Sequence, residues 1–201
     1  MPRYVIDLAD HAALQPSLSG GKGAGLAWLH RQHANVPRGF VITTDAFRDF
    51  LAASAAEGEI LAAGSKHDGD RLAAHTALLQ PGLETAPIPP PIARDIARAY
   101  RDLGGTVAVR SSMVGEDATG TSFAGQFSTL LHVDGEAALL AAVRACWASA
   151  FSRGACAYLA GRGTGPGGGP SGSAMAVVVQ RMVAPTAAGV AFTADPLSGE
   201  L

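Results

Sequence analysis

The chain has 201 residues, enough to bury a hydrophobic core as one domain or two small ones. Hydrophobic residues make up 48% of it and charged residues 16%, a composition typical of a folded protein. The formal net charge of −2 argues against nucleic-acid capture by general electrostatic attraction, so a bound anion must be held by a few placed groups. Only two residues are lysines, Lys22 and Lys66, which makes their positions informative.

The ends and the cysteines favour a cytoplasmic protein with no membrane association. Residues 1–7 have no apolar signal-peptide region and already include an acid. The most apolar stretch, 137–151, is interrupted by Arg144 and is shorter than the roughly 20 residues of a spanning helix. Cys146 and Cys156 lie ten residues apart with no CxxC pair, so we expect no zinc or other metal site and two reduced cysteines.

Strands and helices intermix along the chain, which predicts an α+β fold. In the first half we expect a strand at 4–8, a glycine-rich turn at 17–23 leading into a helix, a strand at 40–43, a helix capped by Thr44, short helices and loops from 55 to about 91, and a helix from Pro91 with Ile92, Ile96, Tyr100 and Leu103 on one face. In the second half we expect a strand at 106–110, a mobile polar loop at 111–125, a strand at 127–133, a helix from 136 to about 159 with Leu140, Val143, Trp147 and Phe151 on one stripe, a flexible glycine-rich loop at 161–173, and a strand at 175–183 paired as a hairpin with 189–193.

Two cations stand where they could hold phosphate. Lys22 lies in the glycine-rich segment 20–23, where backbone N–H groups before a helix converge on an anion. The spacing is not that of a Walker A motif, and a solvated loop lysine is an equally good reading. Arg110 ends an apolar strand and presents a planar fork suited to phosphate oxygens. Its alternative is a structural ion pair with Glu116 or Asp117.

Two further segments have weaker signals of nucleotide binding. The small residues 122–126 lie between two strands and could fold over phosphates, although an ordinary connection explains them as well. Gln180 interrupts an apolar strand, where backbone groups could bond a purine while Met182 and Val183 hold its faces. An edge strand turning to solvent is the alternative.

The order of these motifs resembles the nucleotide-binding domain of the phosphoenolpyruvate synthase and pyruvate phosphate dikinase family. The similar blocks are Gly20-Gly21-Lys22-Gly23-Ala24, Val36 to Thr43, Val109-Arg110-Ser111-Ser112, Glu116-Asp117, Ser122 to Gln126, Cys146-Trp147-Ala148-Ser149, Val177 to Val183 and Gly189 to Pro196. They run from about residue 17 to the end in the order of the family. Rifampin phosphotransferases share this domain, and the sequence does not separate the two groups.

The resemblance implies an ATP-grasp fold, in which ATP lies between two α+β subdomains. Residues 1–201 would form the first subdomain, truncated before the second. By position, ATP-binding roles fall to Lys22, Arg110, Gly125, Thr129, Gln180, Met182 and Val183, with Gly21 and Ser122 as further phosphate-loop candidates. In the complete enzyme, phosphate would pass from ATP to a carrier histidine and then to pyruvate or another acceptor.

Several family features are missing from this sequence. The Mg²⁺ ligands of the family lie in the second subdomain, so we expect Mg²⁺ only together with that part, and no complete catalytic set here. None of the six histidines has the threonine-serine-histidine setting of the phosphocarrier. The missing subdomain and phosphohistidine domain would come from the same longer chain or from a separate partner.

Three readings therefore remain open. The first is the ATP-binding portion of a dikinase-type or rifampin-type phosphotransferase, which binds nucleotide without turnover on its own. The second is a non-catalytic nucleotide-binding or interaction module that a partner chain completes. The third is a degenerate remnant with an exposed apolar face.

Overall fold

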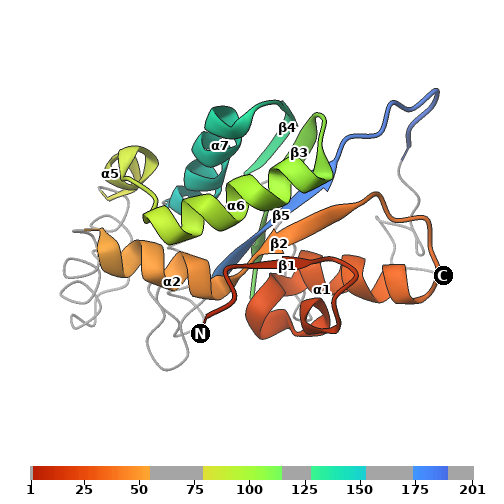
Figure 1. Cartoon of the computed structure of the whole chain (residues 1–201), viewed down its shortest axis with the longest axis horizontal. Coiled ribbons are helices and arrows are strands. Elements are labelled where there is room, and N and C mark those ends of the chain that lie inside the picture. Colours follow the sequence, from red (N-terminus) through yellow and green to blue (C-terminus); the bar gives the residue numbers. More distant parts are fainter. Residues whose placement is uncertain (1, 55–78, 115–127, 153–173, 190–201) are drawn as a thin grey trace, which may run out of the picture.

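The computed structural model describes residues 2–54, 79–114, 128–152 and 174–189. In chain order its elements are β1 (Val5–Asp7), the 3-10 turn η1 (His11–Leu14), α1 (Pro16–Arg31), β2 (Gly39–Ile42), α2 (Thr44–Ala53), α5 (Gln80–Thr85), α6 (Pro90–Leu103), β3 (Val107–Met113), β4 (Thr129–Val133), α7 (Glu136–Ser149) and β5 (Met175–Arg181) (Figure 1). The α+β class predicted from the sequence is confirmed.

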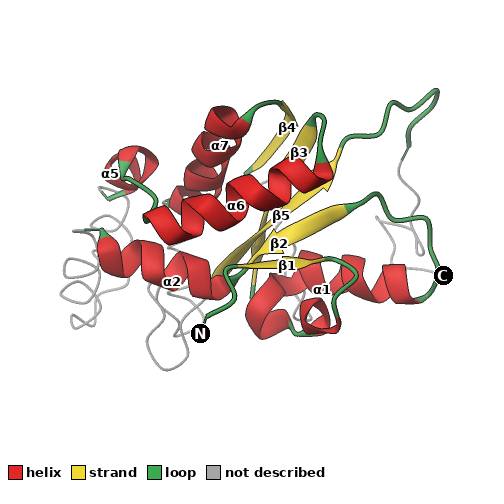
Figure 2. Ribbon diagram, in the orientation of Figure 1, coloured by secondary structure: helices red, strands yellow, loops and turns green. Residues whose placement is uncertain are grey.

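The strands form one five-stranded sheet in the order β1-β2-β5-β3-β4, with antiparallel pairing throughout (Figure 2). β5 is the last of the described strands in sequence, yet it inserts between β2 and β3. Its residues Met175 to Gln180 are all buried, as expected of a β-branched run covered on both faces.

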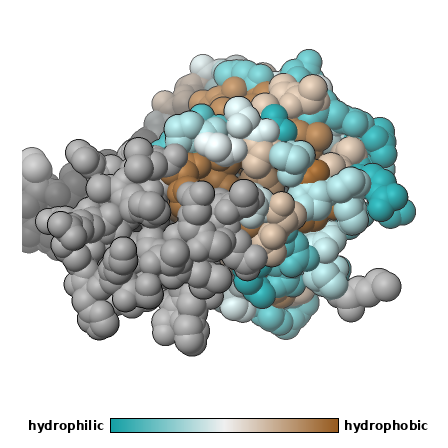
Figure 3. All heavy atoms as spheres, turned by 90° about the vertical axis from the view of Figure 1, so that its left-hand side faces the viewer, coloured by the Kyte–Doolittle hydropathy of each residue, from teal (hydrophilic) through white to brown (hydrophobic). Residues whose placement is uncertain are grey.

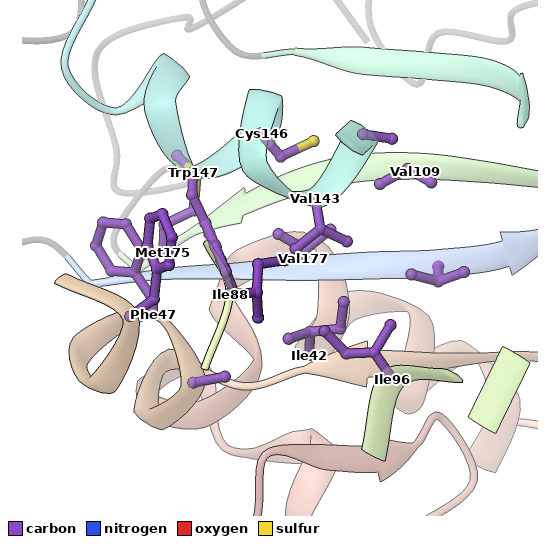
Figure 4. Close-up of a cluster of buried hydrophobic side chains, with 14 of the residues drawn as sticks. Ile42, Phe47, Ile88, Ile96, Val109, Val143, Cys146, Trp147, Met175 and Val177 are labelled. Atoms are coloured by element: carbon purple, nitrogen blue, oxygen red, sulfur yellow. The ribbon is translucent and has the colours of Figure 1, made fainter. Parts of the chain in front are cut away.

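Helices cover both faces of this sheet. The larger core lies on the face packed by α2, α6 and α7, and includes Phe47, Ile96, Trp147 and Val177 (Figure 4). The smaller core lies under α1 and η1 and includes Ala27, Val41, Ala176 and Val178. Strand residues alternate between the two cores because successive side chains point to opposite faces.

The α2–α5 end of the molecule faces the viewer in Figure 3. Brown apolar side chains reach the surface in the middle of this face, and teal hydrophilic ones lie along its edge.

The predicted inward face of α6 is confirmed. Ile92, Ile96, Tyr100 and Leu103 are all buried, and Pro91 lies in the first turn. The spacing of the apolar residues was enough to predict this buried face, because the polar and apolar stripes of the helix are sharply separated. The strands predicted at 4–8, 40–43 and 127–133 are present as β1, β2 and β4.

The prediction that one helix runs from 136 to about 159 is wrong at its C-terminal end. α7 stops at Ser149, and the Ala150 and Phe151 N–H groups donate to the Trp147 and Ala148 carbonyls, respectively, in a closing turn. Phe151 is fully buried after that turn. The local sequence contains no glycine or proline stop signal, so burial of Phe151 rather than propensity accompanies the end of the helix.

The prediction of a loop from residue 111 is also wrong for its first three residues. β3 continues through Ser111, Ser112 and Met113, which pair with Val177, Ala176 and Met175 of β5. Both serines are buried. Their burial costs little because both hydroxyls are hydrogen-bonded. Polar composition therefore gave a misleading loop signal.

Two smaller predictions concern Thr44 and the hairpin partner of β5. Thr44 is the first residue of α2 rather than its cap, and its Oγ1 donates to the Ser17 carbonyl at 2.7 Å. The proposed hairpin partner of β5 lies mostly outside the described residues, at 190–193. Both edges of β5 are already paired between Val177 and Gln180, so no further strand pairs along that stretch.

Candidate functional site

The glycine-rich segment lies at a break between two helical parts of α1. α1 begins at Pro16, and its helical geometry breaks at Gly20, where φ is +68° and ψ is 178°. The predicted turn is thus confined to one residue, and Gly21 and Lys22 lie in the first turn of the segment that follows it. Gly21 and Lys22 are half-buried there. The N-terminal end of a helix segment carries partial positive charge, and anion binding at this end stays a prediction.

The break is packed directly on β3. A Cβ atom on Gly20 would overlap the backbone carbonyl and hydroxyl oxygens of Ser112. The Ser112 Oγ donates to the Ser19 carbonyl at 2.7 Å and accepts from the Gly23 N–H at 3.0 Å. Residues on both sides of the break are therefore bonded to a single side chain of β3.

The register of β3 places Arg110 on the face that α1 covers. Ser112 contacts α1, and Arg110 is two residues before it, so the two side chains share one face of the sheet. Thr129 of β4 is the direct cross-strand partner of Arg110. Lys22, Arg110 and Thr129 were predicted as phosphate ligands, and the structure brings their elements to the same face.

Arg110 is half-buried and makes no ion pair or side-chain hydrogen bond with any residue that the structure describes. The alternative partners Glu116 and Asp117 lie outside those residues. A half-buried guanidinium favours an anionic partner, which a bound phosphate would supply.

Lys22 is also half-buried. Burial raises the pKa of the Cys146 thiol to about 12. A backbone hydrogen bond from Ser111 and, to a smaller extent, the positive charge of Lys22 oppose that rise. The Cys146 Sγ also lies 3.7 Å from the carbonyl of Ser128, which directly precedes Thr129.

Gln180 shares this face at the opposite end of β3. Its register partner is Ala108, two residues before Arg110, and it is 8% exposed. The Gln180 Nε2 donates to the Pro37 carbonyl at 3.1 Å. The alternative reading of an edge strand is wrong, because β5 is central in the sheet.

The central position of β5 changes the predicted purine contact. Backbone groups of Gln180 face Gly39 and Ala108 on neighbouring strands rather than an open edge. The chain leaves the sheet after Arg181, and the Met182 N–H donates to the Thr106 carbonyl at 3.0 Å. Met182 is half-buried and Val183 is 58% exposed, so this pair, and not the backbone of Gln180, borders open surface.

The candidate phosphate and adenine residues are spread along β3 in a definite order. Ser112, Arg110 and Ala108 follow each other at two-residue steps, which span about 13 Å at roughly 3.3 Å per residue. Lys22 belongs to the Ser112 end, and Gln180 lies at the Ala108 end. Ser122, Gly125 and the loop 161–173 lie outside the described residues.

Sequence reasoning missed Ser112 and Pro37, which hold Lys22's helix segment and Gln180, respectively. Position 112 could have been found from its two-residue spacing to Arg110 if the strand had been predicted to continue. The contact between Gln180 and Pro37 joins residues 143 apart and has no local signal.

Hollows among the described residues lie elsewhere. One of about 140 Å³ is bordered by β1, β2 and α6, and one of about 620 Å³ by α6 and α7. Neither is lined by a predicted ligand of ATP. Within the same part of the chain there is no group of three or more His, Cys, Asp or Glu side chains that could hold a metal ion, and no helix long and apolar enough to cross a membrane.

Comparison with known proteins connects this arrangement to a family. The rifampicin phosphotransferase of Streptomyces sviceus is 41% identical over 203 residues, which cover 98% of this chain and 23% of that protein. The prodigiosin synthesizing transferase PigC of Serratia marcescens is 35% identical, with 99% of this chain and 21% of that protein covered. The phosphoenolpyruvate synthase of Aeropyrum pernix is 35% identical, with 91% and 23% covered. The chain thus spans less than a quarter of the length of these relatives.

The family model described as "Pyruvate phosphate dikinase, AMP/ATP-binding domain" matches residues 16–201. This range contains every residue that the sequence predicts as an ATP ligand. It also covers all of the described sheet except β1. The chain belongs to the family of pyruvate phosphate dikinase AMP/ATP-binding domains.

Proposed function

We propose that this chain is the ATP-binding portion of a dikinase-type phosphotransferase. In that role it holds ATP while the γ- or β-phosphoryl group passes to a carrier histidine and then to pyruvate or another acceptor. Residues 1–201 would be the first subdomain of an ATP-grasp fold. The described five-stranded antiparallel sheet with helices on both faces is compatible with this assignment.

The observation that carries the proposal is the cross-strand pair of Arg110 and Thr129 beside the broken helix that bears Lys22. Two cations and a hydroxyl on one face offer charge neutralisation and a hydrogen bond to a polyphosphate. Phosphoryl transfer depends mainly on such positioning and neutralisation. Gly21, Ser122 and Gly125 would add backbone or hydroxyl contacts to the same phosphates.

The adenine end would lie near Gln180, at the opposite end of β3. Met182 and Val183 would hold the purine where the chain leaves the sheet. The Gln180 amide is already bonded to the Pro37 carbonyl, so we assign it the role of fixing this hinge. An extended nucleotide would then run along the α1 face from Gln180 to Lys22.

ATP fits the donor set, whereas Mg²⁺ needs additional ligands. The anionic phosphates would face Lys22 and Arg110, and the guanidinium of Arg110 has no carboxylate partner among the described residues. Mg²⁺ would be bound together with a second subdomain, and a phosphohistidine domain would accept the phosphoryl group. These parts would come from the same longer chain or from a partner.

A rifampicin phosphotransferase is the second candidate. The supporting observation is the higher identity to the Streptomyces sviceus protein, 41% against 35% for the Aeropyrum pernix synthase. The acceptor itself would be bound by parts of those proteins that this chain does not match. The ATP site proposed above serves either enzyme.

Calorimetric titration of the 201-residue chain with a non-hydrolysable ATP analogue and Mg²⁺ tests the site. We expect Lys22→Ala and Arg110→Ala each to cost about 1–3 kcal/mol of binding free energy, or about 5- to 150-fold in Kd. Arg98→Ala is the matched control, because this exposed arginine on α6 lies on the opposite face of the sheet. Its Kd should equal that of the wild type.

Unchanged affinity in both site variants would refute the phosphate assignment. A chain that binds ATP, but whose longer form or partner complex transfers no phosphoryl group, would favour a non-catalytic nucleotide-binding module instead. A folded chain that binds no nucleotide would place the function only in the longer protein.

A further inference from the structure

Ser112 replaces hydrogen bonds that α1 loses at its break. At Gly20 the helical ladder is interrupted, so carbonyl and N–H groups beside the break need other partners. The Ser112 hydroxyl bonds the Ser19 carbonyl before the break and the Gly23 N–H after it, at 2.7 and 3.0 Å. One side chain thus joins the two segments of α1 to β3.

This junction leaves little freedom. Ser112 is 0% exposed, and Ser19 is equally buried beneath it. Gly20 packs so closely on the Ser112 backbone that no Cβ atom could be accommodated. A buried hydroxyl with both of its functions satisfied fixes its neighbours more strongly than an exposed one.

Ser112 is also connected to both candidate phosphate-binding residues, Lys22 and Arg110, through short stretches of backbone. Lys22 immediately precedes Gly23, whose N–H the hydroxyl accepts. Arg110 lies two residues before Ser112 on the same strand and the same face. This contact therefore helps to fix the backbone of Lys22 relative to that of Arg110, in addition to the packing of α1 on the sheet.

We propose that Ser112 is a positioning residue that holds Lys22 in register with Arg110, so that both cations engage one polyphosphate. The inference rests on the proposed function, because it assumes that these two cations bind phosphate. Ser112 itself need not touch the nucleotide. It would determine preference for a triphosphate over the bare nucleoside.

Ser112→Ala in the 201-residue chain is the direct test, with Ser111→Ala as control. Ser111 is the adjacent serine, is 1% exposed, and donates its hydroxyl to the Ser128 carbonyl on the other face of the strand. Titrations with the ATP analogue and with adenosine separate positioning from general damage. We expect Ser112→Ala to weaken analogue binding about tenfold and adenosine binding less than twofold. Ser111→Ala should affect both ligands alike.

A double-mutant cycle with Lys22→Ala identifies the route of the effect. If Ser112 acts through Lys22, Ser112→Ala should weaken analogue binding much less in the Lys22→Ala background. Equal losses for analogue and adenosine, or a full tenfold loss in both backgrounds, would overturn the inference. Ser112→Cys, which keeps a weak donor and acceptor, should give an intermediate loss and serves if Ser112→Ala does not fold.

The results also separate this inference from the function on which it rests. Weaker binding in Lys22→Ala and Arg110→Ala with unchanged binding in Ser112→Ala refutes only the positioning role. Unchanged binding in all three variants refutes the phosphate site as well.

Discussion

Gly20→Ala should be among the most destabilising substitutions in this protein. Gly20 has φ +68° and ψ 178°, a region essentially restricted to glycine, and an alanine there would store about 1–3 kcal/mol of backbone strain. Its Cβ would also overlap Ser112, and relieving that overlap by moving α1 away from β3 would cost about another 1–3 kcal/mol. The sum is about 2–6 kcal/mol, a large part of the 5–15 kcal/mol typical of a domain.

Gly25→Ala, in the same helix, should stabilise the protein, in contrast to Gly20→Ala. Gly25 is exposed, and a Cβ there would meet no atom within 4 Å. Because glycine loses more conformational freedom in a helix than alanine, this variant should be more stable by about 0.5–1 kcal/mol. Unfolding in urea, followed by circular dichroism, measures both free energies.

A Gly20→Ala variant within 1 kcal/mol of the wild type would refute the reasoning. It would mean that the break in α1 adapts to a side chain and that the close contact with Ser112 is dispensable. Equal destabilisation by Gly20→Ala and Gly25→Ala would show that helix glycines act here through a general effect rather than through contact with β3.

Two further predictions concern protonation and backbone strain. Because burial raises the pKa of Cys146 to about 12, above its unfolded value of about 8.5, the folded state keeps this proton as pH rises and the unfolded state releases it. The free energy of unfolding should therefore fall between about pH 9 and 11, by up to about 1.4 kcal/mol per pH unit. Urea unfolding of Cys146→Val at the same pH values should lack this contribution to the fall. Wild type and Cys146→Val losing equal free energy over this range would contradict the prediction. His132 in β4 has φ +56°, so His132→Gly should raise the free energy of unfolding by about 0.5–1 kcal/mol, and His132→Val should lower it despite the strand preference of valine. Thermal unfolding ranks the variants, and a valine variant as stable as the glycine variant would show that the backbone there is unstrained.

Local pattern was sufficient where one element faces one environment. The apolar spacing of α6 predicted its four buried residues, and the apolar run at 175–179 predicted a buried strand. Lys22 and Arg110 stood out as candidate ligands from their residue types and flanking segments alone. Each of these inferences depends on residues close in sequence, whose periodicity and chemistry are visible without the fold.

Tertiary structure decided what depends on distant segments. Pairing with β5 extends β3 through two serines that read as loop, and insertion of β5 between β2 and β3 removes the open edge expected at Gln180. The hydroxyl of Ser112 bonds Ser19 and Gly23, which lie 93 and 89 positions before it, on either side of the break in α1. The sequence by itself thus singled out the candidate residues of the proposed site, whose roles stay predictions. Their arrangement on one face was settled only by strand register and by buried hydrogen bonds between distant residues, neither of which leaves a local signal.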